Sequence, residues 1–320
     1  MTRFVIIGAG AVGGVIGGFL AKVGHDVLLV ARGAHLAALQ AHGLRVETPT
    51  ETFTLPIPAT ARVTWQPGDV ALVATKTQDV TAALRDQALP PEVPVVCMTN
   101  GLEAERIALR FAEQVYAGCV ILPGVHMQPG VVQVWAAPTP GLLDLGRYPE
   151  TTEHDATAQM ISAALVAAGF GSRALQDPLR WKRRKLLLNL ANGAEALVGE
   201  AARSSVIVEL AKAEALACFA ALGLACASEE EDAARRKAIT FAPIGGQRAR
   251  DGGSTYQSLA RGSATLETDY LNGEIVLLGR QGGVPTPVNT RLQQIAAAAA
   301  RARTPAGSMT LDALIEQVIG

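Results

Sequence analysis

Residues 3–14 read RFVIIGAGAVGG, an apolar run that leads directly into a glycine-rich turn. The run 3–7 is predicted to form a strand, and the residues from 11 onward a helix. The intervening glycines have the spacing G-x-G-x-x-G, which combines a tight turn, close approach of backbone to a pyrophosphate, and close packing of helix on strand. A purely structural turn is the alternative. The stretch predicts a dinucleotide-binding loop made of Gly8, Ala9, Gly10, Ala11, Val12 and Gly13.

The second predicted strand, 27–31, indicates which dinucleotide binds. An NAD site usually carries an acidic residue about 20 residues after the glycines, where it holds the ribose 2′-hydroxyl. Here Asp26 precedes the strand, at its wrong end, and Arg32 follows it. A guanidinium can bind a 2′-phosphate. We therefore expect NADPH rather than NADH, the alternative being that Arg32 merely begins a helix in solvent.

The first half of the chain alternates short apolar runs with helical patterns, which predicts a doubly wound parallel sheet covered by helices. The predicted strands are 3–7, 27–31, 70–74, 93–98 and 115–122, and the predicted helices are 11–23, 33–42, 77–88, 102–112 and 151–168. Two further strands, 131–135 and 142–145, are expected to pair with each other in antiparallel fashion.

The second half is predicted to be all helical. Its periodic segments are 179–199, 202–222, 228–241, 264–281, 288–302 and 309–319. The fold class is therefore α/β plus all-α, with one domain at 1–176 and the other at 177–320. The polar, glycine-rich stretch 248–254 is expected to be disordered.

Five polar positions are candidates for a reaction site. Lys76 and Asn100 each follow a predicted strand, where a parallel sheet places its ligands, although both also suit ordinary turns. On a continuous helix, Lys185, Asn189 and Asn192 would share an arc of about 60° among leucines. Burying such a polar face costs free energy unless its groups form hydrogen bonds. The alternative is the wet stripe of an amphipathic helix.

Composition excludes several classes of protein. A net charge of −1 argues against a dedicated nucleic-acid binder. The sequence has no run of about 18 apolar residues without a charge, so no membrane span is predicted, and no secretory leader is expected. The four cysteines and five histidines have no metal-ligand spacing. We expect a cytoplasmic protein without a metal; the oligomeric state stays open, with a homodimer among the alternatives.

The chain resembles the ketopantoate reductase (2-dehydropantoate 2-reductase) family over nearly its whole length. The motifs that carry the resemblance are GAGAVGG at 8–14, Lys76 in TKTQDV, NGLE at 100–103, PG at 129–130, Lys185-x-x-x-Asn189, Ser254 in STYQ, and ETDYLNGEIV with GVPTPVN within 267–289. The resemblance implies a Rossmann-type N-terminal domain, a helical C-terminal domain, and a cleft between them for NADPH and a 2-keto acid. It implies reduction of ketopantoate to pantoate in pantothenate and coenzyme A biosynthesis.

The resemblance also implies roles for individual residues. Lys185 matches the family's general acid, and Glu267 its acidic catalytic residue, which also contacts the cofactor. Asn189 and Ser254 match substrate-binding residues, and we add Asn192 to them. Asn100 and Lys76 match loop residues around the nicotinamide and substrate, and Gly124 matches a small residue beside NADP.

The chain departs from the family pattern on the substrate side. The family often has a second asparagine eight residues after the lysine, but position 193 is glycine and the amide is at Asn192. The segment from Ser254 to Glu267 is one residue longer than usual, and Leu266 replaces a polar residue. These departures motivate one alternative, an NADPH-dependent reductase of another 2-keto acid or carbonyl compound on this fold. The alternative of another class is a non-catalytic NADP-sensing protein.

Overall fold

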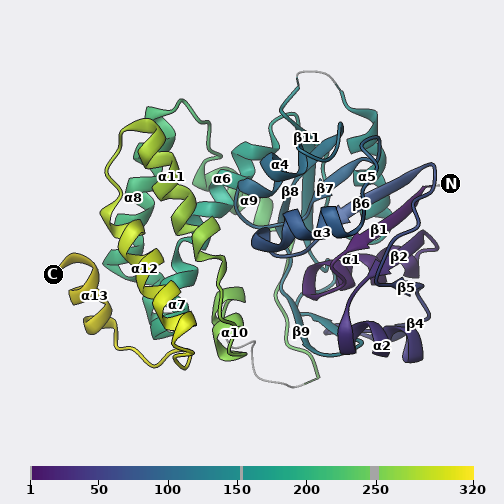
Figure 1. Ribbon diagram of the computed structural model, residues 1–320, viewed down its shortest axis with the longest axis horizontal. Coiled ribbons are helices and arrows are strands. Elements are labelled where there is room, and N and C mark those ends of the chain that lie inside the picture. The colour runs from purple at the N-terminus through teal and green to yellow at the C-terminus, as the bar shows by residue number, and fades with distance from the viewer. Residues whose placement is uncertain (1, 152–153, 246–251) are drawn as a thin grey trace. The chain divides into compact units, whose positions relative to one another are not determined.

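The computed structural model describes residues 2–151, 154–245 and 252–320 (Figure 1). The chain divides into two compact units. The first comprises 1–100, 104–179 and 229–249, and the second comprises 101–103, 180–228 and 250–320. The predicted domains, 1–176 and 177–320, differ from this division mainly because the segment that follows residue 228 belongs to the first unit.

The first unit is built on a seven-stranded sheet with the order β11-β8-β7-β6-β1-β2-β5. All neighbouring strands are parallel except β11, which pairs antiparallel with β8. The strands are β1 (Arg3–Ile7), β2 (Asp26–Val30), β5 (Ala59–Thr60), β6 (Asp69–Val73), β7 (Val95–Cys97), β8 (Val115–Ile121) and β11 (Leu142–Tyr148). The predicted doubly wound, Rossmann-type sheet is confirmed. It could be predicted because apolar runs between turn signals are a strong local cue.

The helices of this unit connect the strands. They are α1 (Ala11–Lys22), α2 (Gly33–His42), α3 (Val80–Asp86), α4 (Glu103–Ala108) and α5 (Ala156–Ala167), with a 3₁₀ turn η1 (Thr77–Asp79) before α3. Side chains from both faces of the sheet form two buried apolar clusters, one including Phe4 and Ile6 and the other Val5 and Ile7. Successive residues of β1 thus point to opposite cores, as in a sheet covered on both faces.

A second sheet, which the sequence did not predict, has the order β4-β3-β10-β9. Its strands are β3 (Leu44–Glu47), β4 (Thr52–Leu55), β9 (Gly124–Gln128) and β10 (Val131–Val134). The expected pairing of 131–135 with 142–145 is wrong. β10 folds back on β9 through the turn at Gly130, whose φ of 77° suits glycine, and β11 pairs with β8 instead.

Helix α1 packs against both sheets, and its glycines make this possible. A methyl group added at Gly17 would lie 2.8 Å from Cδ2 of Leu29 on β2, in the large sheet. One added at Gly18 would lie 2.7 Å from Cγ2 of Val46 on β3, in the small sheet. The repeated Gly-Gly pairs therefore let one helix approach two sheets closely.

Substituting Gly18 by valine should lower the free energy of unfolding by about 1–3 kcal/mol, because the added methyl groups overpack the contact with Val46. Urea denaturation followed by circular dichroism measures this. Ala163→Val, on the exposed side of α5, is the control and should change stability by less than about 0.5 kcal/mol. Equal stability of the two variants would contradict the packing account.

A carboxylate joins two strands of the small sheet. Gln133 Nε2 on β10 donates to Glu47 Oε2 at 2.8 Å, and Arg45 Nε donates to Oε1 at 2.8 Å. The hydrogen bond from Gln133, and then that from Arg45, hold the pKa of Glu47 below its usual value. Because the folded pKa is depressed, the stabilisation is present above the unfolded pKa and is lost as the pH falls through the folded value.

We expect Glu47→Gln to lower the free energy of unfolding by about 1 kcal/mol at neutral pH. The difference from the parent should shrink as the pH falls through the depressed pKa of Glu47, where the parent carboxylate also becomes protonated. Urea titrations at several pH values test this. Glu51→Gln is the control, since Glu51 pairs with Lys22 at an exposed position. A deficit that does not change with pH would argue against the linkage.

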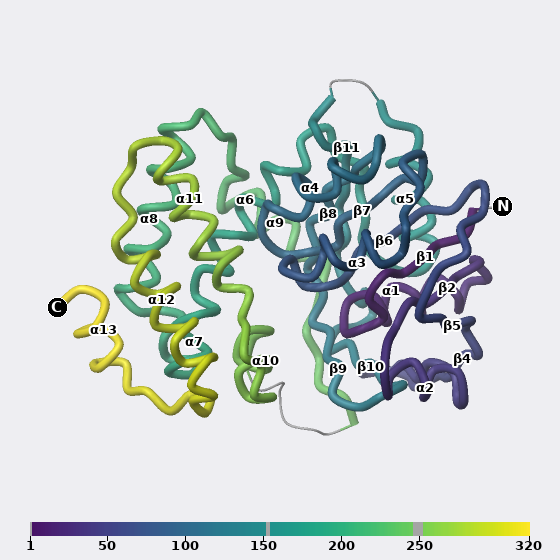
Figure 2. Tube along the Cα trace, viewed as in Figure 1, coloured from purple at the N-terminus to yellow at the C-terminus, as the bar shows by residue number. Residues whose placement is uncertain are grey.

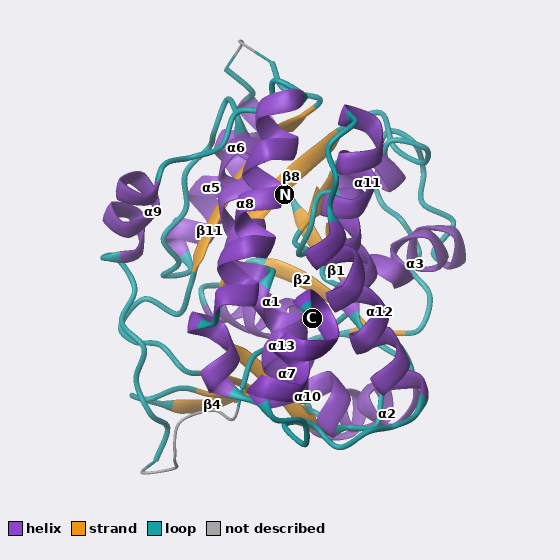
Figure 3. Cartoon of the chain, turned by 90° about the vertical axis from the view of Figure 1, so that its left-hand side faces the viewer, coloured by secondary structure: helices purple, strands orange, loops and turns teal. Residues whose placement is uncertain are grey.

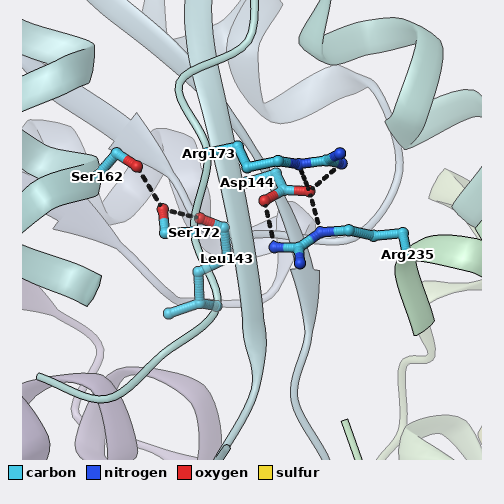
Figure 4. A network of polar contacts seen from close by, with 6 residues as sticks. All are labelled: Leu143, Asp144, Ser162, Ser172, Arg173 and Arg235. Carbon is cyan, nitrogen blue, oxygen red and sulfur yellow. Dashed lines mark hydrogen bonds and ion pairs between the residues drawn. The ribbon is translucent and has the colours of Figure 1, made fainter. Parts of the chain in front are cut away.

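Buried Asp144 explains why the segment after residue 228 joins the first unit (Figure 4). Its carboxylate on β11 accepts from Arg235 on helix α9 (Glu229–Arg236) at 2.7 and 2.9 Å, and from Arg173 at 2.7 and 3.2 Å. An isolated bridge between Ala136 and Phe241 adds to this attachment. In Figure 2 the green tube of this segment runs beside the blue and teal strands of the same unit. The predicted helix 228–241 is therefore shorter than expected: α9 ends at Arg236, and Phe241 pairs with Ala136 instead.

The second unit is helical, as predicted. Its helices are α6 (Pro178–Asn189), α7 (Ala191–Val198), α8 (Val206–Ala221), α10 (Ser254–Ala260), α11 (Asn272–Gly282), α12 (Pro287–Arg301) and α13 (Leu311–Ile319), with 3₁₀ turns η2 (Glu200–Ser204) and η3 (Glu267–Tyr270). Figure 3 shows α7, α12 and α13 side by side. None of the helices in the described ranges is long and apolar enough to cross a bilayer.

Two predictions for this unit, one of a helix and one of disorder, need correction. The predicted helix 179–199 is interrupted at Leu190, so that α6 and α7 are separate. The expected disordered stretch 248–254 lies partly outside the described residues, and its last residue, Ser254, begins α10, which the sequence did not predict.

Candidate functional site

The strand register of the large sheet brings the predicted cofactor-binding loops to one edge. Ile7 of β1 pairs with Val30 of β2 and with Val73 of β6, and Val73 pairs with Cys97 of β7. The parallel strands therefore end at the same level. The loops that follow them begin side by side, at the edge where such sheets bind ligands.

The glycine loop is held tightly except at its centre. Gly8 has φ of 100°, and a methyl group there would lie 2.9 Å from Cγ2 of Thr75. A methyl group at Gly13 would lie 2.2 Å from the carbonyl oxygen of Gly8. By contrast, one added at Gly10 would meet no described atom within 4 Å apart from those of Gly10 and its chain neighbours. The loop thus leaves open space where Gly10 precedes α1.

Three more predicted positions lie at this edge. The hydroxyl of Thr77, next to Lys76, donates to the carbonyl oxygen of Asn100 at 3.0 Å. This bond ties the loop after β6 to the loop after β7. A methyl group added at Gly124 would lie 2.8 Å from the carbonyl oxygen of Ala11, the first residue of α1. The structure therefore brings Lys76, Asn100 and Gly124 together with the glycine loop.

Arg32 stands at the carboxyl end of β2, immediately before α2. Its side chain is 70% exposed, and its Nη1 lies 3.7 Å from Oδ2 of Asp86, which is also exposed. An exposed ion pair at this distance contributes little to stability. The guanidinium is therefore available to an anionic ligand at little energetic cost.

In the second unit, Lys185 and Asn189 lie one turn apart on α6, and both are half-buried. Asn189 is the last residue of that helix. Its Nδ2 atom is buried and has no hydrogen-bond partner among the described residues. Such groups are rare in folded proteins and are usually satisfied by a ligand or an ordered water.

Asn192 is buried and hydrogen-bonded to another side chain of the second unit. It is 5% exposed on α7, and its Oδ1 accepts from Nη2 of Arg203 at 3.2 Å. A methyl group at neighbouring Gly193 would instead lie 3.2 Å from Cγ2 of Thr268 and 3.4 Å from Oδ1 of Asn272. Asn192 and Gly193, neighbours on α7, thus lie against different parts of the second unit.

The buried carboxylate of Glu195 links α7 to the segment that carries Ser254. It is 3% exposed and accepts two hydrogen bonds from Arg203, at 2.8 and 2.7 Å. It also accepts from the backbone N–H of Gly253 at 3.0 Å, which fixes the start of α10 just before Ser254. Sequence reasoning did not single out Glu195 or Arg203; a charged residue inside the apolar run 190–198 is the signal that could have found the first.

Glu267 begins η3 and is buried, with 6% exposure. Its neighbour Thr268 is the residue that Gly193 faces. Helix α7 therefore contacts both α10, which begins at Ser254, and η3, which begins at Glu267. Within the second unit, the fold gathers these predicted site segments around one short helix.

The glycine loop on a Rossmann-type sheet and the separate helical unit define a two-part protein of the dinucleotide-binding α/β class. The sequence model described as "Ketopantoate reductase PanE/ApbA" matches residues 4–150, and that of its C-terminal part matches residues 178–300. The chain belongs to the ketopantoate reductase family.

Curated relatives agree with this assignment. The 2-dehydropantoate 2-reductase of Mesorhizobium japonicum is 30% identical over 326 residues, covering 89% of this chain and 94% of the relative. The enzyme of that name from Archaeoglobus fulgidus is 29% identical over 301 residues, covering 91% and 96%.

Solved structures have the same fold. A PanE/ApbA family ketopantoate reductase from Ralstonia eutropha superposes with a TM-score of 0.77 at 29% identity, covering 94% of this chain and 99% of that one. D-mandelate dehydrogenase, solved with NADH and anilino(oxo)acetate, gives a TM-score of 0.80 at 23% identity with coverage of 94% and 99%. At that identity the second likeness concerns the fold alone.

Proposed function

We propose that this protein reduces 2-dehydropantoate (ketopantoate) to pantoate with NADPH, a step of pantothenate and coenzyme A biosynthesis. Family membership supports the reaction class. The observation that carries the proposal is that the buried Nδ2 of Asn189 has no hydrogen-bond partner in the described chain. Asn189 lies one helical turn from Lys185. An unsatisfied amide beside an ammonium suits a substrate that brings hydroxyl, carbonyl or carboxylate oxygens.

NADPH would supply a hydride to the C2 carbonyl carbon. As that bond forms, the electron pair of the carbonyl moves to oxygen, which becomes negative. The Lys185 ammonium stabilises this oxygen and donates its proton to it, giving the 2-hydroxy acid. Asn189, Asn192, Ser254 and Asn100 orient the substrate, and Glu267 contacts both the reacting groups and the cofactor.

The residues of the first unit suit NADPH. The open space at Gly10 admits a pyrophosphate close to the backbone, and the first turn of α1 offers amide N–H groups to it. The exposed guanidinium of Arg32 can pair with the 2′-phosphate. Lys76, Asn100 and Gly124 line the same edge, where they can contact the cofactor.

The test is NADPH oxidation by the purified protein with a panel of 2-keto acids that includes ketopantoate. We expect the highest kcat/KM with ketopantoate. Higher kcat/KM with another member of the panel would favour the alternative of a different 2-keto acid. Gly193 motivates that alternative, because it carries no amide where the family often has one, while Asn192 is engaged by Arg203.

A non-catalytic NADP-sensing protein is the alternative of another class. It predicts tight NADPH binding, measured by fluorescence of the bound nicotinamide, together with no turnover of any carbonyl compound in the panel. The presence of both Lys185 and Glu267 favours the enzyme.

A further inference from the structure

His35, on the first turn of α2, joins two backbone segments that are far apart in sequence. Its Nε2 lies 2.7 Å from the carbonyl oxygen of Ala9 in the glycine loop. Its Nδ1 lies 2.9 Å from the backbone nitrogen of Gly130, in the turn between β9 and β10. The ring also packs on that of His126, with centroids 4.3 Å apart. The half-buried imidazole therefore bridges the glycine loop and the small sheet.

These two partners determine which ring nitrogen carries the proton. The backbone N–H of Gly130 can only donate, so Nδ1 of His35 must accept and carries no hydrogen. The carbonyl oxygen of Ala9 can only accept, so Nε2 must donate. Both bonds exist together only for the neutral Nε2–H tautomer. The geometry thus assigns the imidazole one directional role, donation to the glycine loop.

The bond to Ala9 also orients the next amide. A trans peptide is planar, and its C=O and N–H point in opposite directions. Holding the Ala9 carbonyl toward His35 therefore turns the Gly10 N–H away from His35. Gly10 has open space around it and no side chain to restrict rotation of that peptide. Among described residues, its N–H has no hydrogen-bond acceptor.

We propose that His35 is a positioning residue for the cofactor: by bonding to Ala9 it holds the Ala9–Gly10 peptide in the orientation that presents the Gly10 N–H to the dinucleotide pyrophosphate. The inference rests on the proposed function, in which the glycine loop binds NADPH. His35 itself touches no reacting group. Its loss should therefore affect NADPH binding and leave the chemical step unchanged.

Two substitutions separate the two bonds of His35. In His35→Gln the side-chain amide N–H can still donate to Ala9, whereas the contact with Gly130 is lost. In His35→Asn the shorter side chain can keep an acceptor near Gly130 but does not reach Ala9. His35→Ala removes both bonds. His42→Ala, at the exposed end of the same helix, is the matched control.

The dissociation constant of NADPH is measured for each variant by nicotinamide fluorescence, and kcat and both KM values by NADPH oxidation. We expect the dissociation constant to rise about tenfold in His35→Ala and His35→Asn, and at most about threefold in His35→Gln. The kcat at saturating NADPH and the KM for the keto acid should stay within about twofold of the parent.

Rescue of NADPH affinity by glutamine together with unchanged kcat supports the proposal, because a merely structural role would impair NADPH binding, kcat and KM alike. Parent-like NADPH affinity in His35→Ala, or equal affinities of the Gln and Asn variants, would overturn it. If the alanine variant does not fold, the order of the Gln and Asn variants still decides. If the parent binds NADPH but reduces no keto acid, the proposed function fails, while the affinity comparison still tests His35.

Discussion

Replacing Lys185 by alanine should lower kcat by about 10²–10⁴-fold, the usual contribution of a positioned general acid. The dissociation constant of NADPH should change by less than about twofold, since the residues proposed to bind the cofactor's phosphates lie on the first unit. The physical reason is that charge develops on the substrate oxygen only as hydride arrives. An ammonium that stabilises that charge lowers the barrier more than it favours ground-state binding.

The matched variants for this prediction are Lys185→Arg and Lys182→Ala. Arginine keeps the positive charge but does not release its proton in the working pH range, so it should restore only part of kcat. Lys182 lies on the same helix but is 3% exposed. Steady-state kinetics and NADPH titration provide both readouts. If Lys185→Ala turns over like the parent, Lys185 is not the acid, and a loss of kcat in Lys182→Ala would move the role there.

Arg32→Asp should reverse the cofactor preference. Removing a charge-assisted bond to the 2′-phosphate costs about 1.5–3 kcal/mol, and a carboxylate at the end of β2 adds repulsion. The same carboxylate can accept from the 2′-hydroxyl of NADH. The ratio of kcat/KM for NADPH to that for NADH should therefore fall by about 10²-fold or more.

Asp86→Ala is the control for this change, because Asp86 is the exposed partner of Arg32 in the protein. It should leave the preference for NADPH unchanged or slightly stronger, since a competing carboxylate is removed. Rising ionic strength should weaken NADPH binding more in the parent than in Arg32→Asp. A cofactor ratio equal in parent and Arg32→Asp would show that Arg32 does not bind the 2′-phosphate.

Local features of the sequence predict the core strands of the first unit. Predicted strand 3–7 agrees with β1 residue for residue, and predicted strands 27–31 and 70–74 are each displaced by one residue from β2 and β6. These strands are short apolar runs bounded by turn residues, and the glycine spacing fixes the turn between β1 and α1. All of these cues lie within a few neighbouring residues, which is why they can be read without a structure.

The small sheet, in contrast, depends on pairing between segments far apart in the sequence. The strands β3 and β4 are partly exposed and lack a continuous apolar run, and β3 pairs with β10 more than eighty residues away, as in the match of Val46 with Val132. The segment after residue 228 likewise joins the first unit through Arg235, which binds Asp144 from 91 residues away. Contacts of this length leave no periodic trace in the sequence.

The residues of the candidate site likewise fall into two groups, those that local motifs predict and those whose contacts depend on the tertiary structure. Local motifs singled out Gly10, Lys185 and Asn189, because their spacing along one turn or one helix carries the chemistry. The hydrogen-bond partners of Asn192 and His35 depend on tertiary contacts: Asn192 accepts from Arg203, and the ring of His35 meets two backbone segments, one before it and one far after it in sequence. Hydrogen-bond partners are set by where distant segments meet, and this is what only the folded chain determines.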